Sequence, residues 1–472
     1  MVSNSTLPND FVESLESIVG ADHVRTDELS RDVYGVDALQ RGRRADVVVL
    51  PGGTTEVANI ARVCDQALVP LTARGAGTGY TGGAVPVFGG VVLSLERMNR
   101  IIEIDTASLL AIVEPNVVTA DLQAAVEQLG LFYPPDPASL NRSVIGGNVA
   151  ECAGGPRAFK YGTTKRYVLG LEAVLPTGQV IRTGGKSVKN VVGYDLTQLL
   201  VGSEGTLAIV TQVILRLIPR PPARATLRAT FPSVSRALEA VEAMVADGVV
   251  PAALELIDAD CVRALERHHD AETSSGEAVV LLIEVDGMPT SIIEEAERVT
   301  HACTTAEGIV TAAADEAERD RLWSDRRDLS PVLLALAPRK INHDVVVPKG
   351  RIPRLFEVIA RLKTVYRLPM PSFGHVGDGN IHVNILVDPA DAEAMRRAGQ
   401  AERQLFKEVV ALDGSISGEH GIGFSKAQFL GLELSSETIA LMRRLKQAFD
   451  PNGILNPGKI FPKTDEDAAQ AP

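Results

Sequence analysis

Hydrophobic and polar positions change with two different periods along the first half of the chain. Residues 45–50 (ADVVVL) form a short apolar run, which is typical of a buried strand. Residues 54–68 instead repeat apolar side chains at three- and four-residue spacing, which predicts an amphipathic helix capped by Thr54 or Thr55. The same criteria predict strands at 69–73, 91–95, 110–113, 168–175, 179–183 and 206–218, and a helix at 119–128.

The pattern changes after residue 218, where three prolines (Pro219, Pro221 and Pro222) follow a predicted strand and indicate a domain boundary. Beyond them, the order of elements favours an α+β domain with an antiparallel sheet and helices packed on one face. The predicted strands lie at 225–231, 278–285 and 342–347, and the predicted helices at 235–246, 290–305, 352–365 and 435–449.

Composition and charge exclude several classes of protein. The 472 residues carry a net charge of −13, which repels polyanions, so no nucleic-acid partner is expected. The four cysteines are scattered and include no C-x-x-C pair, which suits a reducing cytoplasm better than disulfides. No apolar stretch approaches the ~20 residues that a membrane span needs. We therefore expect a cytoplasmic protein, with peripheral association with the inner membrane left open.

A glycine ladder, RGAGTGYTGG, runs from Arg74 to Gly83. Gly77, Gly79 and Gly82 fit the G-x-G-x-x-G pattern of dinucleotide-binding folds, but no helical period follows, so the Rossmann interpretation fails. The ladder instead predicts a loop of exposed backbone N–H groups that can surround a diphosphate. A flexible glycine turn is the alternative, and it is disfavoured by the conformational entropy that so many glycines cost.

Further glycine clusters lie at residues 143–155 (SVIGGNVAECAGG), 160–170 and 202–211 (GSEGTLAIVT). With the ladder, they resemble the flavin-binding domain of the vanillyl-alcohol oxidase/PCMH superfamily over about residues 40–220. Within that superfamily the chain is most similar to the group that contains D-lactate dehydrogenase, D-2-hydroxyglutarate dehydrogenase and the flavoprotein component of glycolate oxidase. This closer resemblance extends to Phe461.

The resemblance implies FAD as cofactor, with the ladder on its diphosphate. The glycine loop contains no histidine, so the FAD is expected to be non-covalent. The resemblance also implies a two-lobed PCMH-type FAD-binding domain at 1–222, a cap domain with the substrate and metal site at 223–440, a segment at 441–463 that packs back on the FAD domain, and a flexible tail at 464–472. The implied cofactor-binding residues are Arg74, Gly75, Ala76, Gly77, Thr78, Gly79, Gly82, Gly83, Pro135, Asp136, Ser139, Gly146, Gly147, Asn148, Gly154, Gly155, Gly162, Gly205, Ile209 and Asn456.

The segment FGHVGDGNIHVNI, residues 373–385, predicts a hairpin with a tight glycine turn, so that His375 and His382 approach from opposite arms. Two imidazoles need at least one more ligand, and the later motif SGEHGIG offers Glu419. A His-His-Glu set with open positions predicts a divalent metal, zinc or manganese, that also holds substrate. The alternative is that these are turn and core histidines.

His420, beside the ligand Glu419, is the predicted catalytic base, and the resemblance implies the same role. Arg326 stands where the group has its substrate arginine, with Ser330 one turn later, and a guanidinium fork suits a carboxylate. Lys340 is a second candidate cation, and Asn384, on the same strand face as His382, is a further predicted substrate-binding residue. Arg326 is also predicted to be catalytic, together with His420. The alternative is that Arg326 and Lys340 form structural salt bridges and do not bind substrate.

These motifs together predict oxidation of a D-2-hydroxy acid, with hydride passing from C2 to the flavin. D-lactate is the first choice, and glycolate and D-2-hydroxyglutarate are alternatives. Two further hypotheses are a non-redox enzyme like alkyl-glycerone-phosphate synthase and a non-catalytic flavoprotein that relays electrons. No iron–sulfur cysteine pattern is present, so the expected electron acceptor is a quinone, a cytochrome, an electron-transferring flavoprotein or an iron–sulfur subunit. A homo-oligomer is left open.

Overall fold

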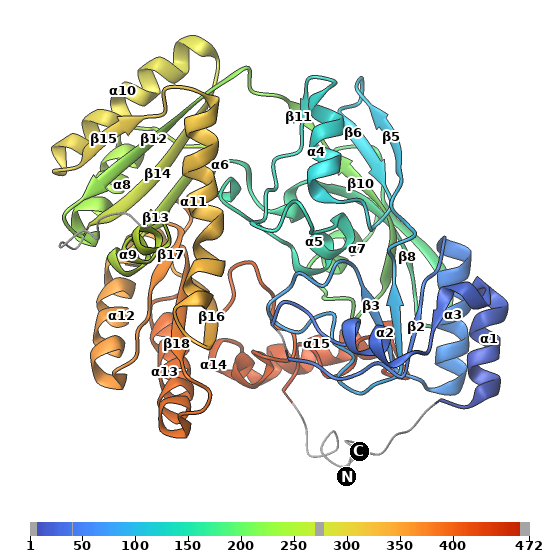
Figure 1. Cartoon of the computed structure of the whole chain (residues 1–472). Coiled ribbons are helices and arrows are strands. Elements are labelled where there is room, and N and C mark those ends of the chain that lie inside the picture. The colour runs from blue at the N-terminus through green and yellow to red at the C-terminus, as the bar shows by residue number, and fades with distance from the viewer. Residues whose placement is uncertain (1–6, 40, 270–277, 463–472) are drawn as a thin grey trace. The chain divides into compact units, whose positions relative to one another are not determined.

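The computed structural model describes residues 7–39, 41–269 and 278–462, and the chain divides into two compact units (Figure 1). Unit 1 comprises Met1–Ala153, Thr163–Arg220 and Glu419–Pro472, and unit 2 comprises Gly154–Gly162 and Pro221–Gly418. The chain returns from unit 2 to unit 1 at 418/419, whereas the sequence predicts the end of the cap domain at 440/441. The predicted tail at 464–472 lies outside the described residues.

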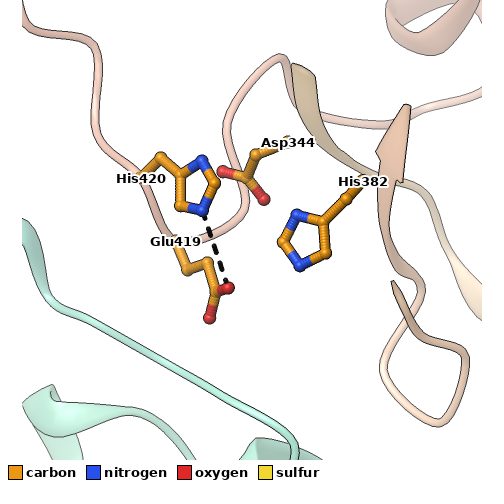
Figure 2. A group of neighbouring side chains, drawn as sticks. All are labelled: Asp344, His382, Glu419 and His420. Atoms are coloured by element: carbon orange, nitrogen blue, oxygen red, sulfur yellow. Dashed lines mark ion pairs between the residues drawn. The ribbon is translucent and has the colours of Figure 1, made fainter. Parts of the chain in front are cut away.

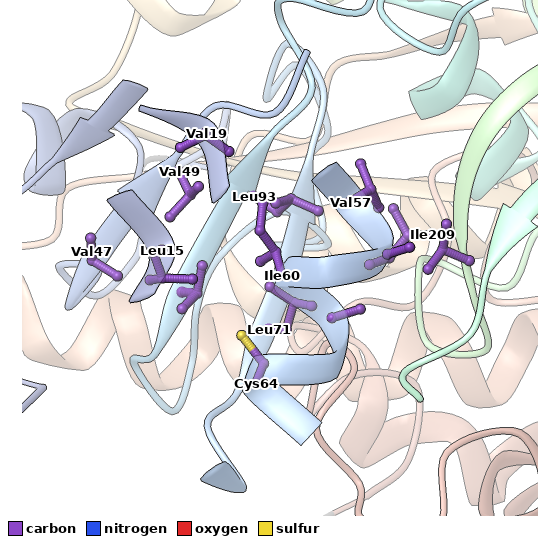
Figure 3. Packing of buried hydrophobic residues seen from close by; sticks show 14 of the residues in the cluster. Leu15, Val19, Val47, Val49, Val57, Ile60, Cys64, Leu71, Leu93 and Ile209 are labelled. Carbon is purple, nitrogen blue, oxygen red and sulfur yellow. The ribbon is translucent and has the colours of Figure 1, made fainter. Parts of the chain in front are cut away.

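Unit 1 begins with a small sheet in the order β1-β2-β4-β3, in which β2, β4 and β3 are parallel and β1 is antiparallel. Helix α3 follows β2 as the periodicity predicts, and α1 packs beside it. Apolar side chains from these elements form the core in Figure 3, where Ile60 and Cys64 of α3 meet Leu71 and Leu93 of the strands. The elements are α1 (Asn9–Val19), β1 (Val24–Arg25), α2 (Glu28–Val33), β2 (Val47–Val49), α3 (Thr54–Ala67), β3 (Leu71–Arg74) and β4 (Val91–Ser94).

A second sheet of unit 1 is antiparallel, in the order β5-β6-β10-β8-β9. Buried and partly exposed side chains alternate along β10, as expected of a strand with one face in the core. Strands β7 and β11 pair in a separate two-stranded sheet. The remaining strands and α-helices of unit 1 are β5 (Ile101–Asp105), β6 (Leu110–Val113), α4 (Thr119–Glu127), β7 (Leu131–Phe132), α5 (Ile145–Glu151), β8 (Val168–Val174), β9 (Val180–Gly184), α7 (Leu196–Leu200), β10 (Ile209–Arg216), β11 (Ile218–Pro219), α14 (Leu430–Glu433) and α15 (Ser436–Phe449).

Unit 2 is built on a seven-stranded sheet in the order β15-β12-β14-β13-β17-β18-β16, with every pairing antiparallel. Its strands are β12 (Ala223–Phe231), β13 (Ala253–Ile257), β14 (Val279–Gly287), β15 (Ile309–Ala312), β16 (Arg339–Val346), β17 (Ser372–His375) and β18 (Asn380–Val387). Its helices are α6 (Ala158–Tyr161), α8 (Val234–Ala246), α9 (Ala259–His268), α10 (Pro289–Thr305), α11 (Glu316–Ala335), α12 (Ile352–Tyr366) and α13 (Ala392–Ala411).

Polar side chains set the starts of several helices in unit 2. Ser233, Asp258, Asp315 and Asp391 each accept a hydrogen bond from a backbone N–H in the first turn of the helix that follows. The predicted α+β class, with an antiparallel sheet in the cap domain, is confirmed. Helices α9, α11 and α13 were not predicted from the sequence.

Candidate functional site

The glycine ladder forms the loop that leaves β3 at Arg74. Gly77 and Gly82 have φ angles of +67° and +82°, a region that glycine occupies without strain. A Cβ at Gly77 would overlap the Arg74 guanidinium, whose Nη1 donates to the Val36 carbonyl oxygen at 2.7 Å. Within the described residues, no hydrogen bond is found from the backbone N–H groups of residues 75–79. This loop therefore presents backbone donors of the kind that surround a diphosphate.

The second predicted glycine cluster is mostly helical, because residues 145–151 form α5. Gly146 packs closely, since a Cβ there would lie 2.6 Å from the Cβ of Pro115. Gly147 has more room, with Val144 Cγ2 the closest atom at 3.7 Å. The amide of Asn148 is buried and donates to Thr119 Oγ1 at 2.8 Å. The two glycines of this helix thus differ in function, one serving packing and the other leaving space.

The remaining predicted cofactor residues are divided between the units. Gln123 donates to the Pro135 carbonyl oxygen at 2.9 Å, and the side chain of Ile209 is buried in the core of unit 1. Asp136 and Ser139 lie on the loop between β7 and α5. Gly154, Gly155 and Gly162 belong to the short stretch assigned to unit 2.

Asn456 joins two of these glycine segments within unit 1. Its Nδ2 donates to the carbonyl oxygens of Gly83 at 2.8 Å and Glu204 at 2.7 Å, and its Oδ1 accepts from Lys459 Nζ at 2.9 Å. Gly205 follows Glu204 with a φ angle of +67°. The C-terminal segment therefore fixes the end of the glycine ladder.

The predicted histidine hairpin is formed by β17 and β18, with Gly379 in the turn at a φ angle of +92°. His382 lies opposite Phe373, and His375 lies opposite Asn380. Residues opposite each other in antiparallel strands project on the same face, so both imidazoles share one face of the sheet. Their ring centroids are 5.3 Å apart.

That face also carries the other polar residues of the site, by the same reasoning from register. Asp344 lies opposite His382, and Asn342 lies opposite Asn384. Glu255 lies opposite His375. The Asn384 side chain is fully buried, accepting from Asn342 Nδ2 at 2.8 Å and donating to the Pro371 carbonyl oxygen at 3.2 Å.

Glu255, which sequence reasoning missed, is the charged centre of this face. It is fully buried and binds His375 Nδ1 through Oε1 at 2.5 Å and Arg326 Nε through Oε2 at 2.6 Å. Burial alone would raise the pKa of the Glu255 carboxyl, but the charges of Arg326 and His375 outweigh it and lower the pKa to about 2. Arg326 also stacks over the Phe373 ring at 4.6 Å.

Lys340 and Ser330, two predicted substrate residues, contact each other, because Lys340 Nζ donates to the Ser330 hydroxyl and, at 3.2 Å, to its carbonyl oxygen. Burial lowers the pKa of Lys340 to about 8. A lysine with such a pKa exists in both protonation states near neutral pH.

Four side chains converge in Figure 2: Asp344, His382, Glu419 and His420. Each offers one ligand atom, and these atoms all lie within 4.8 Å of one another. Glu419 Oε1 and His420 Nε2 are 3.9 Å apart. The group contains two of the three predicted metal ligands, His382 and Glu419, and the predicted base, His420. Its fourth member, Asp344, was not predicted from the sequence. His375 is not a member, and its Nδ1 faces Glu255 instead.

Asp344 has a second connection, to the backbone that leads into Glu419. Its Oδ2 accepts from the Gly418 N–H at 2.9 Å and from Ser417 Oγ at 3.3 Å, while its Oδ1 accepts from Asn380 Nδ2 at 2.6 Å. Both carboxylate oxygens are therefore engaged, and the carboxylate sets the path of the chain just before Glu419.

Unit 1 holds the same chain on the other side of His420. Glu204 accepts from the Ile422 N–H at 2.8 Å through Oε1 and from the Gly423 N–H at 2.7 Å through Oε2. Thr81 donates through Oγ1 to the His420 carbonyl oxygen at 3.0 Å. Glu204 itself has a φ angle of +53°, a conformation that costs a non-glycine residue ~1 kcal/mol or more and persists where its surroundings require it.

Glu151 is a second carboxyl beside this loop, since a Cβ at Gly421 would overlap Glu151 Oε2 and come within 3.0 Å of Glu204 Oε1. Burial, followed by the charge of Glu204, raises the pKa of Glu151 well above its ordinary value. Burial raises the pKa of Glu204 above its ordinary value as well, while the N–H groups of Ile422 and Gly423 act in the opposite direction and favour its charged form. Glu151 therefore keeps its proton more readily than Glu204. Sequence reasoning missed both carboxyls, although the GSEG motif contains Glu204.

Comparison with known proteins identifies the class. Residues 45–184 match the family described as FAD binding domain, and residues 220–460 match the family described as FAD linked oxidases, C-terminal domain. The chain belongs to the FAD-linked oxidases.

Its curated relatives specify the group. It is 40% identical to the glycolate oxidase subunit GlcD of Bacillus subtilis (97% of this chain, 98% of the relative) and 37% identical to that of Escherichia coli K12 (95% and 90%). It is 34% identical to a probable mitochondrial D-lactate dehydrogenase of Danio rerio (97% and 93%). The protein is thus an FAD-linked oxidoreductase of the glycolate oxidase GlcD and D-lactate dehydrogenase group, and the predicted family is confirmed.

Solved structures share the fold at low identity. The chain matches p-cresol methylhydroxylase with a TM-score of 0.79 and 18% identity (96% of each chain). It matches 4-ethylphenol oxidase of Gulosibacter chungangensis with a TM-score of 0.78 and 21% identity (96% and 97%). Among the helices of the described residues, none is long and apolar enough to cross a membrane.

The shared ion pairs of Glu255 predict a defined pH dependence of stability. Because its folded-state pKa of about 2 lies below the ordinary 4.5, the carboxylate stabilises the fold above about pH 4.5, and this contribution disappears as the pH falls towards 2. A Glu255→Gln variant should be less stable than the parent at pH 6 by an amount on the order of 3 kcal/mol. Measured by urea unfolding, this difference in unfolding free energy should be smaller at pH 3. A Glu13→Gln variant, changed at an exposed residue, is the control and should unfold like the parent at both pH values. A difference for Glu255→Gln that does not change with pH would contradict the low pKa of Glu255.

Proposed function

We propose that this protein oxidises a small D-2-hydroxy acid with bound FAD and a divalent cation, and that D-lactate, converted to pyruvate, is the first-choice substrate. The observation that carries the proposal is the group formed by Asp344, His382, Glu419 and His420, because it brings a histidine-carboxylate ligand set and a candidate base together. The family membership supports FAD as cofactor.

His382 and Glu419, with His375 as the third ligand expected from the sequence, would hold the cation. Imidazole nitrogen with a carboxylate oxygen suits zinc or manganese, and the buried Asp344 and His382 provide the shielded surroundings that such a site needs. A cation bound there would lower the pKa of the substrate hydroxyl. We assign Asp344 a positioning role, because both of its oxygens already accept hydrogen bonds.

His420 would accept the proton of the substrate hydroxyl as the C2 hydrogen leaves as hydride. Its neighbours support this role, since Glu419 Oε1 is 3.9 Å from its Nε2 and can stabilise the imidazolium that forms. FAD, when bound, supplies the two-electron acceptor for that hydride. The products are the 2-oxo acid, a proton on His420 and reduced cofactor.

Arg326 and Lys340, with Ser330, would recognise the substrate carboxylate, and Asn384 would support the strand that carries His382. The Nε–H of Arg326 donates to Glu255, and this hydrogen bond orients the other N–H groups of the guanidinium. Glycolate is the second candidate substrate, favoured by the names of the two relatives at 40% and 37% identity. D-2-hydroxyglutarate is a third. We propose a quinone, a cytochrome, an electron-transferring flavoprotein or an iron–sulfur subunit as the electron acceptor, and the cytoplasm or the surface of the inner membrane as the location.

The substrate class is tested by mixing the FAD-loaded protein anaerobically with D-lactate, L-lactate, glycolate or D-2-hydroxyglutarate and following flavin absorbance. D-lactate should bleach the flavin faster than L-lactate and the other acids. Chelator treatment should slow the bleaching, and added zinc or manganese should restore it. Bleaching that is insensitive to chelation would contradict the metal role, and no bleaching by any acid would contradict the whole proposal.

A His420→Ala variant should keep its flavin yet reduce it at least ~100-fold more slowly, in line with the worth of a general base. His301, an exposed residue of α10, provides a matched His301→Ala control that should reduce at the parental rate. Parental rates in the His420→Ala variant would exclude it as the base.

Glu204→Gln should slow flavin reduction by roughly 10-fold with little change in substrate KM, because an amide accepts only one of the two N–H bonds that hold the chain after His420. Glu204→Asp should recover part of the rate. Glu172 is a buried carboxylate elsewhere in unit 1, where Arg182 and Thr54 bind it, so Glu172→Gln is the matched control. Equal losses in the Glu204→Gln and Glu172→Gln variants would indicate a purely structural effect.

A further inference from the structure

The loop between β9 and α7 in unit 1 exposes a run of apolar side chains. Val191, Val192 and Tyr194 are 96%, 91% and 95% exposed, and Val188 is 66% exposed. Single exposed apolar residues are ordinary, whereas a cluster within seven residues of one loop marks an interaction site. The proposed function makes no use of this loop.

Local hydrogen bonds hold the loop in this conformation. Asp195 caps α7 by accepting from the Gln198 N–H at 2.9 Å, and the Leu196 N–H donates to the Tyr194 carbonyl oxygen at 2.9 Å. The Val192 N–H donates to Asn190 Oδ1 at 3.2 Å, and Gly193 turns the chain with a φ angle of +76°. The apolar side chains are thus presented outward by an ordered turn.

The surroundings of the loop are basic, in a chain whose net charge is −13. Lys186 and Lys189 lie within the loop, and Gln198 of α7 donates to the Lys165 carbonyl oxygen at 3.2 Å, which brings exposed Lys165 and Arg166 beside it. Among the carboxylates near the loop, Glu103 pairs with Lys186 at 2.7 Å and Asp195 caps α7. Lys165, Arg166 and Lys189 add positive charge beyond these two, so the loop favours an anionic partner.

We propose that residues 186–194 insert into an anionic lipid surface. Val191 and Val192 are consecutive and both more than nine-tenths exposed, so a single flat protein surface would leave one of them uncovered, whereas a fluid bilayer interface surrounds a loop from every side. Tyrosine is favoured at the level of the lipid headgroups, and lysines beside an apolar tip are attracted to anionic lipids. The proposal concerns unit 1 alone and does not depend on the hydroxy-acid chemistry.

The test is flotation of the FAD-loaded protein with phosphatidylcholine vesicles, with and without phosphatidylglycerol. The parent should float with the anionic vesicles and be released by high salt, because salt screens the lysine contribution. A variant carrying Val191→Ser, Val192→Ser and Tyr194→Ser should lose at least ~10-fold of the binding, and Lys189→Glu should weaken it on anionic vesicles only. All variants should keep their flavin content.

Ile309 on the edge strand β15 of unit 2 is 74% exposed, so Ile309→Ser is the control for loss of an exposed apolar residue and should float like the parent. Parental flotation by the triple variant, or no flotation of the parent, would overturn the proposal. Self-association that the triple variant abolishes, seen by light scattering without vesicle binding, would overturn it in favour of a second copy of the chain.

Discussion

Two buried carboxylates bind the backbone on either side of His420, and the candidate site depends on this constraint. Asp344 accepts from the Gly418 N–H before the Glu419–His420 pair, and Glu204 accepts from the N–H groups of Ile422 and Gly423 after it. Hydrogen bonds from the backbone N–H groups to these two buried carboxyls hold a glycine-rich segment that would otherwise be flexible. A base can act only if its nitrogen is fixed to within a fraction of an ångström, and this segment has that support.

A second constraint is the register of the seven-stranded sheet, which collects the polar side chains of unit 2 on one face. His382 on β18 lies opposite Asp344 on β16 and opposite Phe373 on β17. Glu255 on β13 lies opposite His375 on β17. A slip of one residue in either pairing would turn a histidine to the opposite face. Burial of this face makes each charge depend on its partner, as shown by Glu255, which stays ionised because Arg326 and His375 both bind it.

The loop at residues 186–194 contrasts with this centre. Inside the site, the buried side chains of Glu255, Asp344 and Asn384 form specific hydrogen bonds, and specificity comes from geometry. At the loop, apolar side chains are exposed beside lysines, and the interaction that we propose requires only a fluid anionic surface. In our two proposals, buried polar contacts orient the chemistry of the site, and exposed apolar side chains attach the loop to a membrane.

Much of the fold follows from local pattern. The apolar runs around residues 47–49 and 91–94 and the helical period after Thr54 predict strands and a helix that the structure contains, because a strand or helix must bury one face whatever surrounds it. The motifs GHVGDGNIH and SGEHG also indicate a common site by their chemistry. Local pattern did not predict the helix at Ile145–Glu151, because tertiary packing overrides the low helix propensity of Gly146 and Gly147.

Sequence alone predicted a diphosphate-binding glycine loop, a domain boundary after residue 218 and a candidate base, because glycine spacing, hydrophobic period and residue type are local properties, while FAD as the cofactor was implied by the family resemblance. Only the tertiary structure decided that Asp344 stands beside His382, that His375 faces Glu255, and that Glu204 holds the chain after His420. Each of these contacts joins residues between 38 and 219 positions apart, from Asp344 and His382 to Glu204 and Gly423. Strand register and burial bring such pairs together, and neither can be read from the neighbours of a residue in the chain.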